Sequence, residues 1–233
     1  MTKTVGFIGL GVLGSAMAPN IIKSGFEVTG FDVRAEAMAD MEAVGMKPGA
    51  SPKDVAEKVD VVVTCLPSLE VLHNVFGGED GIDKAYKPGQ IVIETSTFPV
   101  AEKEKARDTL AAVGKVTLDC PVSGNRILAV KKQLTAFGSG DEAAYRSVED
   151  VVGGFAHRKF YIGDFGSGMK MKFCGNILNL VHNSVAAEVM VLGMKSGLDP
   201  KVIHEAIGGS GSSSSMFEVR GEMMVRNNYD HEG

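Results

Sequence analysis

The feature that most constrains the fold is a G-x-G-x-x-G run at Gly9, Gly11 and Gly14, which directly follows an apolar stretch at residues 5–8. Where a strand ends in such a turn and a helix begins, the first glycine permits the tight turn and the second lets a pyrophosphate approach the backbone. The third lets helix and strand pack closely, while the helix N-terminus offers unpaired N–H groups. The run therefore predicts a dinucleotide-binding turn. We assign its cofactor contacts to consecutive residues: Gly9, Leu10, Gly11, Val12, Leu13 and Gly14.

The residues that follow the glycines fit this prediction. Residues 12–24 have an apolar helical pattern closed by Gly25, and residues 26–31 predict a strand that ends at Asp32. In dinucleotide-binding folds, an acidic residue at about this distance accepts hydrogen bonds from the adenosine ribose. Asp32 favours NAD over NADP because a carboxylate repels a 2′-phosphate, whereas Arg34 could instead bind that phosphate. The alternative, in which the glycines serve only as turn residues, leaves the strand, the spacing and the acid unexplained.

Composition limits the classes of partner. The chain has 233 residues, of which 44% are hydrophobic, enough for one large or two modest domains. Its net charge of −5 offers no basic surface, so we expect no nucleic-acid partner. We expect no membrane partner, because no apolar run looks long enough to span a bilayer. We also expect a cytoplasmic location, because the first strand begins too close to Met1 to leave room for a signal peptide.

Cysteine and histidine spacing gives no sign of a metal site. Cys65, Cys120 and Cys174 are odd in number and widely separated, so reduced thiols are expected. None of the histidines stands at a familiar metal-ligand spacing. We therefore predict no metal.

Strand and helix patterns alternate over the first two-thirds of the chain, which is typical of a parallel sheet covered by helices on both faces. The later strands are expected at residues 60–66, 90–94, 115–119, 134–137 and 159–162, with helices at residues 100–113 and 142–152. We expect the last two strands to complete the same sheet. The strand ends at Leu66 and Thr97 fall on its carboxyl edge, where open α/β folds bind ligands.

The pattern changes after Gly163. Apolar residues recur at helical spacing over residues 169–195 without a proline, which predicts one long helix. Asp199 and Pro200 begin a further helix, and residues 208–215 suit either a flexible linker or a loop that caps a short helix after it. The predicted fold class is therefore α/β. A Rossmann-type doubly wound sheet forms a dinucleotide-binding domain at 1–163, and a long interdomain helix and an all-α region follow at 164–233.

Three segments give the chain a resemblance to a known family. They are the glycine-rich residues 6–14, the sequence Asp-Cys-Pro-Val-Ser-Gly at 119–124, and Gly-Ser-Gly at 166–168 followed by Lys172 and Asn176. In this order they resemble the signatures of the β-hydroxyacid dehydrogenases, which include 3-hydroxyisobutyrate dehydrogenase, tartronate semialdehyde reductase and, more distantly, 6-phosphogluconate dehydrogenase. The resemblance implies an oxidoreductase that transfers a hydride between NAD, with NADP possible, and a small β-hydroxy acid or its semialdehyde.

The resemblance also implies residue roles. Lys172 would take the hydroxyl proton as the hydride departs and return it in the reductive direction, which requires burial or positive charge to lower its pKa. By residue type alone it would be an ordinary exposed lysine. Asn176, four residues later on the same helix face, would bond the hydroxyl or hold the lysine. Ligand contacts are assigned to Ser123, Gly124 and Asn125 for the substrate carboxylate, and to Leu66, Pro67 and Thr97 for the cofactor.

The chain departs from the family pattern at several positions. Asn125 stands where the family commonly has glycine, so we expect a different substrate pocket. Gly175 stands where relatives have asparagine or, in the phosphogluconate enzymes, histidine, so we do not expect oxidative decarboxylation of phosphogluconate. Family members usually continue well past the position of Gly233. The helical substrate or dimerisation domain that the resemblance implies at 164–233 is therefore expected to be incomplete, with apolar helix faces that favour a homodimer or homotetramer.

Two other functions stay open. An NADPH-dependent glyoxylate or succinic semialdehyde reductase is disfavoured by Asp32. A non-catalytic dinucleotide-binding module is favoured by the shortened helical domain and disfavoured by Lys172. The identity of the hydroxy acid is beyond the sequence, because it depends on pocket shape.

Overall fold

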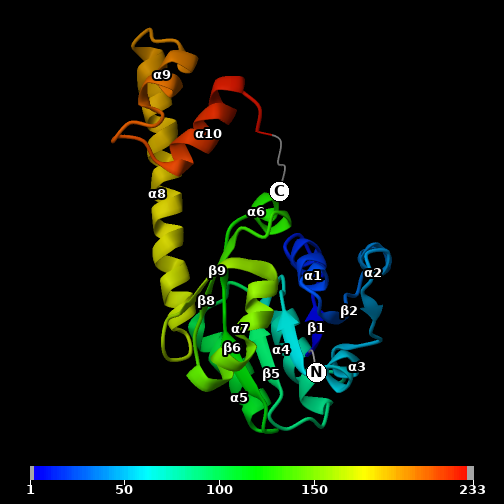
Figure 1. Ribbon diagram of the computed structural model, residues 1–233. Coiled ribbons are helices and arrows are strands. Elements are labelled where there is room, and N and C mark those ends of the chain that lie inside the picture. The colour runs from blue at the N-terminus through cyan, green and yellow to red at the C-terminus, as the bar shows by residue number, and fades with distance from the viewer. Residues whose placement is uncertain (1–2, 230–233) are drawn as a thin grey trace. The chain divides into compact units, whose positions relative to one another are not determined.

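The computed structural model describes residues 3–229 and divides into two compact units. The first ends at Lys172 and the second begins at Phe173. Helix α8 (Ser167–Lys195) is continuous across this division. All of the described strands precede α8, so they belong to the first unit (Figure 1).

The first unit is built on a six-stranded parallel sheet with the order β3-β2-β1-β4-β5-β6 (Figure 1). Its strands are β1 (Thr4–Ile8), β2 (Glu27–Phe31), β3 (Lys47–Pro48), β4 (Val61–Thr64), β5 (Ile91–Glu94) and β6 (Val116–Asp119). Strand β1 pairs with both β2 and β4, so the strand order reverses beside it. The predicted Rossmann-type doubly wound sheet is confirmed.

Helices cover both faces of this sheet because each strand buries side chains on both sides. Phe7 and Val63 join the core cluster formed with α1 and α7, whereas Ile8 and Val62 join the cluster formed with α3, α4 and α5. The helices are α1 (Gly14–Lys23), α2 (Ala35–Glu42), α3 (Pro52–Lys58), α4 (Leu69–Gly77), α5 (Val100–Ala111) and α7 (Glu142–Phe155), with a 3-10 turn at Ile82–Lys84. This two-sided burial explains the continuous apolar runs of the strands.

The later strands form a separate three-stranded sheet with the order β7-β8-β9. They are β7 (Val122–Ser123), β8 (Leu134–Gly138) and β9 (Ala156–Tyr161), with α6 (Arg126–Val130) between the first two. The prediction that the segments near 134–137 and 159–162 complete the main sheet is therefore wrong. Strand β6 meets this second sheet through an antiparallel bridge between Asp119 and Ser139. Pro121, two residues later, has no N–H to donate, but its carbonyl oxygen accepts from the Phe137 N–H at 3.0 Å, and the pairing continues into β7 and β8.

Two glycines allow α8 to begin against the second sheet. Gly166 has a φ of +88°, a backbone conformation that residues with a Cβ rarely adopt. A Cβ on Gly168 would lie 2.2 Å from the carbonyl oxygen of Phe137. The first glycine therefore permits the turn into α8, and the second permits close packing of its first turn on β8.

The second unit contains the rest of α8 together with α9 (Pro200–Ile207) and α10 (Ser215–Arg226). Its small core combines Met190, Ile203 and Phe217. The Asp199 side chain caps α9, and the Ser214 hydroxyl caps α10 by accepting from the Phe217 N–H at 3.1 Å. Of the two alternatives for residues 208–215, the structure shows the capping loop.

Helix α8 is long and apolar enough, by length and composition alone, to cross a membrane. The prediction that no apolar run reaches this length is therefore wrong for this helix. Only 11% of its most apolar window is buried in the single chain, and Ile177, Leu180 and Leu192 are all exposed. Core and interface helices of soluble proteins share this length and composition, so these two properties assign no membrane span by themselves.

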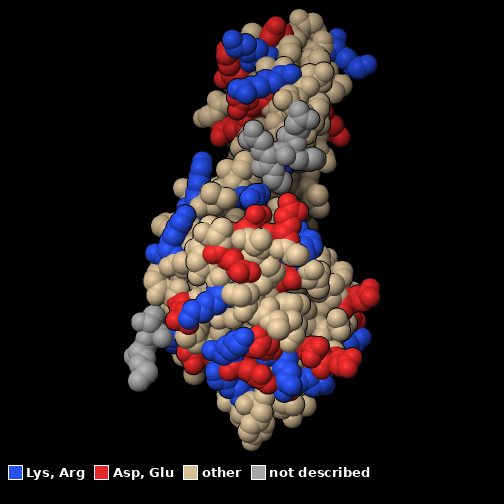
Figure 2. Space-filling view, turned by 90° about the vertical axis from the view of Figure 1, so that its right-hand side faces the viewer, with Lys and Arg blue, Asp and Glu red and all other residues tan. Residues whose placement is uncertain are grey.

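The charged surface of the first unit is mixed in sign. On the face shown in Figure 2, lysine and arginine side chains alternate with aspartate and glutamate. Interspersed charges of both signs partly cancel, so this face presents no continuous basic field.

Two glycines of α8 that differ in their surroundings, Gly168 and Gly175, allow a direct test of this packing by measurement of stability. We expect Gly168→Ala to lower the free energy of unfolding by about 1–3 kcal/mol, because the added methyl group clashes with backbone. Gly175→Ala is the matched control. No described atom lies within 4 Å of its added Cβ, and the change should raise helix stability by about 0.5–1 kcal/mol. Urea denaturation measures both effects, and equal stability of the two variants would contradict the packing argument.

Candidate functional site

The glycine-rich turn lies between β1 and α1, at the carboxyl edge of the main sheet. Gly9 has a φ of +94°, and its N–H donates to the carbonyl oxygen of Phe31 at 3.0 Å. A Cβ on Gly14 would lie 2.0 Å from the Gly9 oxygen, so the turn closes tightly only with glycine there. In contrast, no described atom lies within 4 Å of a Cβ built on Gly11. The turn is therefore packed on its inner side and open where a phosphate group would approach.

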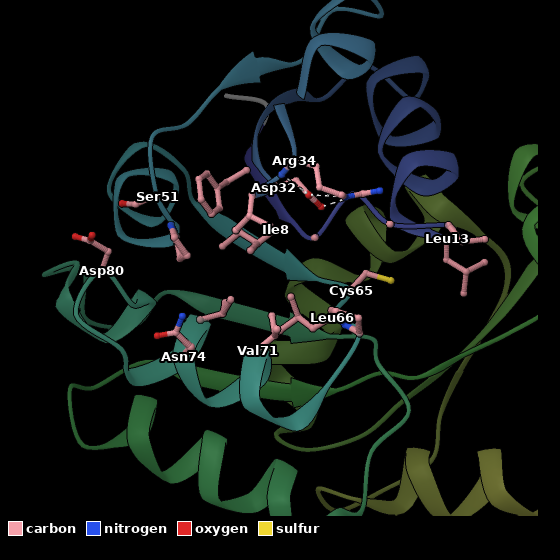
Figure 3. Close-up of a pocket in the computed structure, with 18 of the residues that line it drawn as sticks. Ile8, Leu13, Asp32, Arg34, Ser51, Cys65, Leu66, Val71, Asn74 and Asp80 are labelled. Atoms are coloured by element: carbon pink, nitrogen blue, oxygen red, sulfur yellow. Dashed lines mark hydrogen bonds and ion pairs between the residues drawn. The ribbon is translucent and has the colours of Figure 1, made fainter. Parts of the chain in front are cut away.

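A cavity of about 840 Å³ lies over this turn and the ends of β2 and β4 (Figure 3). Its size is that of a pocket for a large cofactor. The predicted cofactor residues that line it are Gly9, Gly11, Val12, Leu13, Asp32, Leu66 and Pro67. Leu10 and Gly14 do not line it and instead pack the turn from behind, while Thr97 is exposed beyond the end of β5.

Asp32 connects the end of β2 to the glycine-rich turn. Its carboxylate accepts from the Leu10 N–H at 2.7 Å. It also pairs with the Arg34 guanidinium at 3.0 Å (Figure 3). The guanidinium also donates to the Leu10 carbonyl oxygen at 2.8 Å. Burial alone would raise the pKa of Asp32, but the hydrogen bonds from Arg34 and Leu10 outweigh burial and hold this pKa below its ordinary value. Asp32 is therefore ionised at neutral pH, with a cation beside it.

The sequence reasoning missed residues at the far end of this cavity. Ser51, Asn74 and Asp80 line it, and Figure 3 shows them away from Leu13. The Ser51 hydroxyl accepts from the Asp54 N–H at 3.1 Å and caps α3. A detectable signal was present, because serine followed by proline and then aspartate is a pattern typical of a helix start. Asn74 and Asp80 carry no such local signal.

The segment predicted to receive the substrate carboxylate is attached to the glycine-rich turn. Gly124, after β7, has a φ of +136° and faces Leu134, whose side chain would lie 2.5 Å from an added Cβ. The Asn125 side chain accepts from the Leu128 N–H at 3.1 Å and so caps α6. Arg126 donates to the Val12 carbonyl oxygen at 3.0 Å. This arginine thus joins the loop at residues 123–125 to the glycine-rich turn.

Lys172 lies one turn after the start of α8, still within the first unit. Its side chain is partly buried, and desolvation lowers its pKa from the ordinary value. The neighbouring Lys170 is exposed. Asn176 is four residues further along α8 but belongs to the second unit. The direction of this shift is the one that a proton-transfer role would need.

No cluster of histidine, cysteine and carboxylate side chains suited to a metal ion occurs within residues 3–229. Cys65 lines the cavity, and burial raises the pKa of its thiol to about 11. The burial of Cys120 raises its pKa to about 12. Both thiols are therefore protonated at neutral pH and unreactive as nucleophiles.

Two family models match consecutive parts of the chain. Residues 4–163 match the NAD-binding domain of 6-phosphogluconate dehydrogenase. Residues 166–233 match the NAD-binding region of NADP-dependent 3-hydroxyisobutyrate dehydrogenase. The two matches leave only residues 1–3 and 164–165 uncovered, so nearly the whole chain is accounted for.

Individual proteins agree with the family models. The chain is 34% identical to an L-threonate dehydrogenase from Cupriavidus necator, over 98% of the chain and 77% of that enzyme. It is 38% identical to mitochondrial 3-hydroxyisobutyrate dehydrogenase from Rattus norvegicus, over 85% of the chain and 59% of that enzyme. The crystal structure of 3-hydroxyisobutyrate dehydrogenase from Salmonella typhimurium superposes with a TM-score of 0.86 at 30% identity, over 97% of the chain and 80% of that structure. The chain thus spans well under two-thirds of the rat enzyme.

Substitutions of two glycines at the turn should cause two different defects. Gly11→Ala should leave the free energy of unfolding nearly unchanged but raise the dissociation constant for NADH about tenfold or more, because its methyl group projects into open space. Gly14→Ala should weaken NADH binding and also destabilise the fold by about 1–3 kcal/mol, because its methyl group meets the Gly9 carbonyl. Fluorescence titration and urea denaturation separate the two effects. Loss of stability in Gly11→Ala would show that the open side of the turn has been misassigned.

Proposed function

The chain belongs to the β-hydroxyacid dehydrogenase family, and from this membership we propose that it transfers a hydride between NAD and a small β-hydroxy acid or the matching semialdehyde. The carbon that is oxidised carries a hydroxyl group β to a carboxylate. Its named relatives are dehydrogenases of 3-hydroxyisobutyrate and L-threonate, and each of these acids carries a hydroxyl group β to its carboxylate. These two acids are the first substrates to test.

The cavity suits a nicotinamide dinucleotide. The chain contains an NAD(P)-binding domain, and the open side of the turn at Gly11 leaves the space that a pyrophosphate needs. Leu66 and Pro67 provide an apolar wall, and Asp32 provides a carboxylate for ribose hydroxyls. When bound, the nicotinamide supplies the hydride acceptor for oxidation and the donor for reduction.

The observation that carries the proposal is the position of Lys172 on a helix that begins at the carboxyl edge of the main sheet, the edge that also forms the cavity. In oxidation, its neutral amine takes the proton of the substrate hydroxyl at Nζ. In reduction, its ammonium group returns that proton. Desolvation supports this role because it favours the neutral amine over the ammonium ion.

Neighbouring residues are proposed to bind and orient the substrate. Ser123 and the backbone at Gly124 would receive the carboxylate, since a loop of N–H groups binds anions well. The Asn125 side chain already caps α6, so its contribution would come from its backbone. Asn176 would bond the substrate hydroxyl or hold the Lys172 amine.

The cofactor preference is proposed to be NAD. An ionised Asp32 would repel a 2′-phosphate, but its partner Arg34 is more exposed, with 58% of its side chain accessible against 9% for the aspartate. The guanidinium would therefore attract the same phosphate. The two opposing charges give a preference for NAD that leaves NADP usable.

We also propose a separate role for each of the two parts of the chain. Residues 1–163 would bind the dinucleotide, while residues 164–233 would contribute to the substrate site and to pairing with a second copy. The exposed apolar side chains of α8, among them Ile177 and Leu180, support self-association into a dimer or tetramer. We propose a cytoplasmic location for the enzyme.

The central experiment is a fluorescence titration of the 233-residue chain with NADH and NADPH, followed by turnover assays with 3-hydroxyisobutyrate and L-threonate. NADH binding with turnover would support the dehydrogenase. Binding without turnover on any small β-hydroxy acid would contradict it and favour a non-catalytic dinucleotide-binding module. Turnover of glyoxylate or succinic semialdehyde with NADPH alone would favour the alternative reductase.

Lys172→Met should lower kcat by about 100- to 10,000-fold, because it removes the proton-transfer group. In the unaltered chain, the oxidation rate should rise with pH to a plateau, because only the neutral amine accepts a proton. The midpoint should lie below the ordinary lysine value of 10.5, because desolvation lowers this pKa. Lys170→Met, which removes an exposed lysine two residues away, is the control and should retain both the rate and its pH profile. Equal activity of the two variants would refute the assignment.

The Asp32–Arg34 pair should set the cofactor preference. Asp32→Asn keeps an oxygen for the Leu10 N–H but removes the charge. It should therefore raise the ratio of the NADH dissociation constant to the NADPH dissociation constant about tenfold, in favour of NADPH. Arg34→Ala should shift the ratio in the opposite direction. Val33→Ala, which changes no charge, serves as the control. Ratios that stay constant in both charged variants would rule out this electrostatic explanation.

A further inference from the structure

A buried ion cluster lies at the carboxyl edge of the main sheet, next to the cavity rather than in it. It joins Lys103 of α5 to Glu94 at the end of β5 and Asp119 at the end of β6. The lysine Nζ lies 2.6 Å from the Glu94 carboxylate and also contacts the Asp119 carboxylate. The Glu94 contact is between opposite charges and lacks the geometry of a directional hydrogen bond. None of the three residues is more than 1% exposed.

Such a cluster is expensive to bury, because each charge loses its hydration. Burial alone would lower the pKa of Lys103, but the two carboxylates outweigh it and raise this pKa above its ordinary value. Well-packed apolar residues often stabilise a core as well as a buried ion pair does. Stability therefore does not explain the cluster, and its other hydrogen bonds indicate its role.

One side of the cluster holds the first turn of α8. The Asp119 carboxylate accepts from the Met169 N–H at 2.9 Å and from the Ser139 hydroxyl at 3.0 Å. The Ser139 oxygen accepts in turn from the Gly168 N–H at 3.0 Å. The first N–H groups of a helix have no partner within the helix. Asp119 and Ser139 supply these partners from the ends of two different strands.

The other side of the cluster holds the cavity wall. The Lys103 ammonium group donates to the Ser96 carbonyl oxygen at 3.0 Å, and the Ser96 N–H donates to Glu94 at 2.8 Å. The Ser96 hydroxyl oxygen accepts from the Leu66 N–H at 2.7 Å. Leu66 lines the cavity. A continuous set of buried contacts therefore runs from the cavity wall to the start of α8.

We propose that Lys103, Glu94 and Asp119 form a positioning cluster. This cluster holds the first turn of α8, and with it Lys172, at a fixed position relative to the cavity wall at Leu66. The three residues touch neither cofactor nor substrate, and act through the backbone groups that they hold. The inference rests on the proposed function, because Lys172 is the proposed proton-transfer residue.

The test compares two buried lysines. Lys103→Met leaves the carboxylates without their cation, whereas Lys115→Met removes a lysine that is 3% exposed and bonds Gln90 at the opposite end of β6. Amide hydrogen exchange should become about tenfold faster at Gly168 and Met169 in Lys103→Met, because Asp119, which accepts from Met169 and from the Ser139 hydroxyl that holds Gly168, loses the cation that fixes its position. In Lys115→Met it should stay unchanged after correction for global stability. Equal exchange in the two variants would overturn the proposal.

A second readout follows the lysine itself. In protein labelled with carbon-13 at the lysine ε position, the Lys172 titration should move toward the ordinary lysine pKa in Lys103→Met, since a looser helix start admits water. Lys115→Met should leave it in place. A titration of Lys172 that is identical in both variants would also contradict the proposal.

A milder variant covers the case in which Lys103→Met fails to fold. Ser139→Ala removes only the hydroxyl group that accepts from Gly168, and the control Thr117→Val removes a buried hydroxyl without a hydrogen-bond partner on β6. Exchange at Gly168 should rise in the first variant only. These measurements need no turnover. Activity that survives Lys172→Met would therefore refute the proton-transfer role of Lys172, and unchanged exchange would refute the positioning cluster.

Discussion

The parallel pairing of β1 with β2 on one side and β4 on the other is the constraint on which the rest of the first unit depends. It brings the carboxyl ends of these strands to one edge and sends their connections away in opposite directions, which opens a crevice there. The glycine-rich turn closes over β1 because Gly9 adopts a positive φ and Gly14 has no Cβ. The cavity is therefore a consequence of strand order and two glycines.

The same edge also gathers buried charged groups. Buried carboxylates at the ends of β5 and β6 must find partners, and they find them in Lys103 and in the first N–H groups of α8. Asp32 similarly pairs with Arg34 and with the backbone of the turn. Because unpaired buried charges are strongly unfavourable, these contacts hold the glycine-rich turn and the start of α8 against the strand ends. The polar framework of this edge thus has one part at the glycine-rich turn and another at the start of α8.

Local patterns predicted the parts of this framework that depend on neighbouring residues. The turn at Gly9 and Gly14, the position of Asp32 and the long helix all follow from spacing and periodicity, and the structure shows each of them. The assignment of 134–137 and 159–162 to the main sheet failed, because an apolar strand has the same pattern in either sheet. Asn74 and Asp80 escaped notice because their place in the cavity depends on α4 folding over β4, which no local signal reports.

By itself, the sequence determined the fold class, the cofactor turn and the family, because these depend on short segments whose backbone requirements only particular residues meet. The tertiary structure alone decided which side chains are paired. Arg34 neutralises Asp32, Asn125 caps a helix, and Lys103 holds Asp119 and the start of α8. The physical reason is that desolvation and ion pairing act across strands and helices far apart in the chain, so the charge and position of a side chain depend on neighbours that local spacing does not specify.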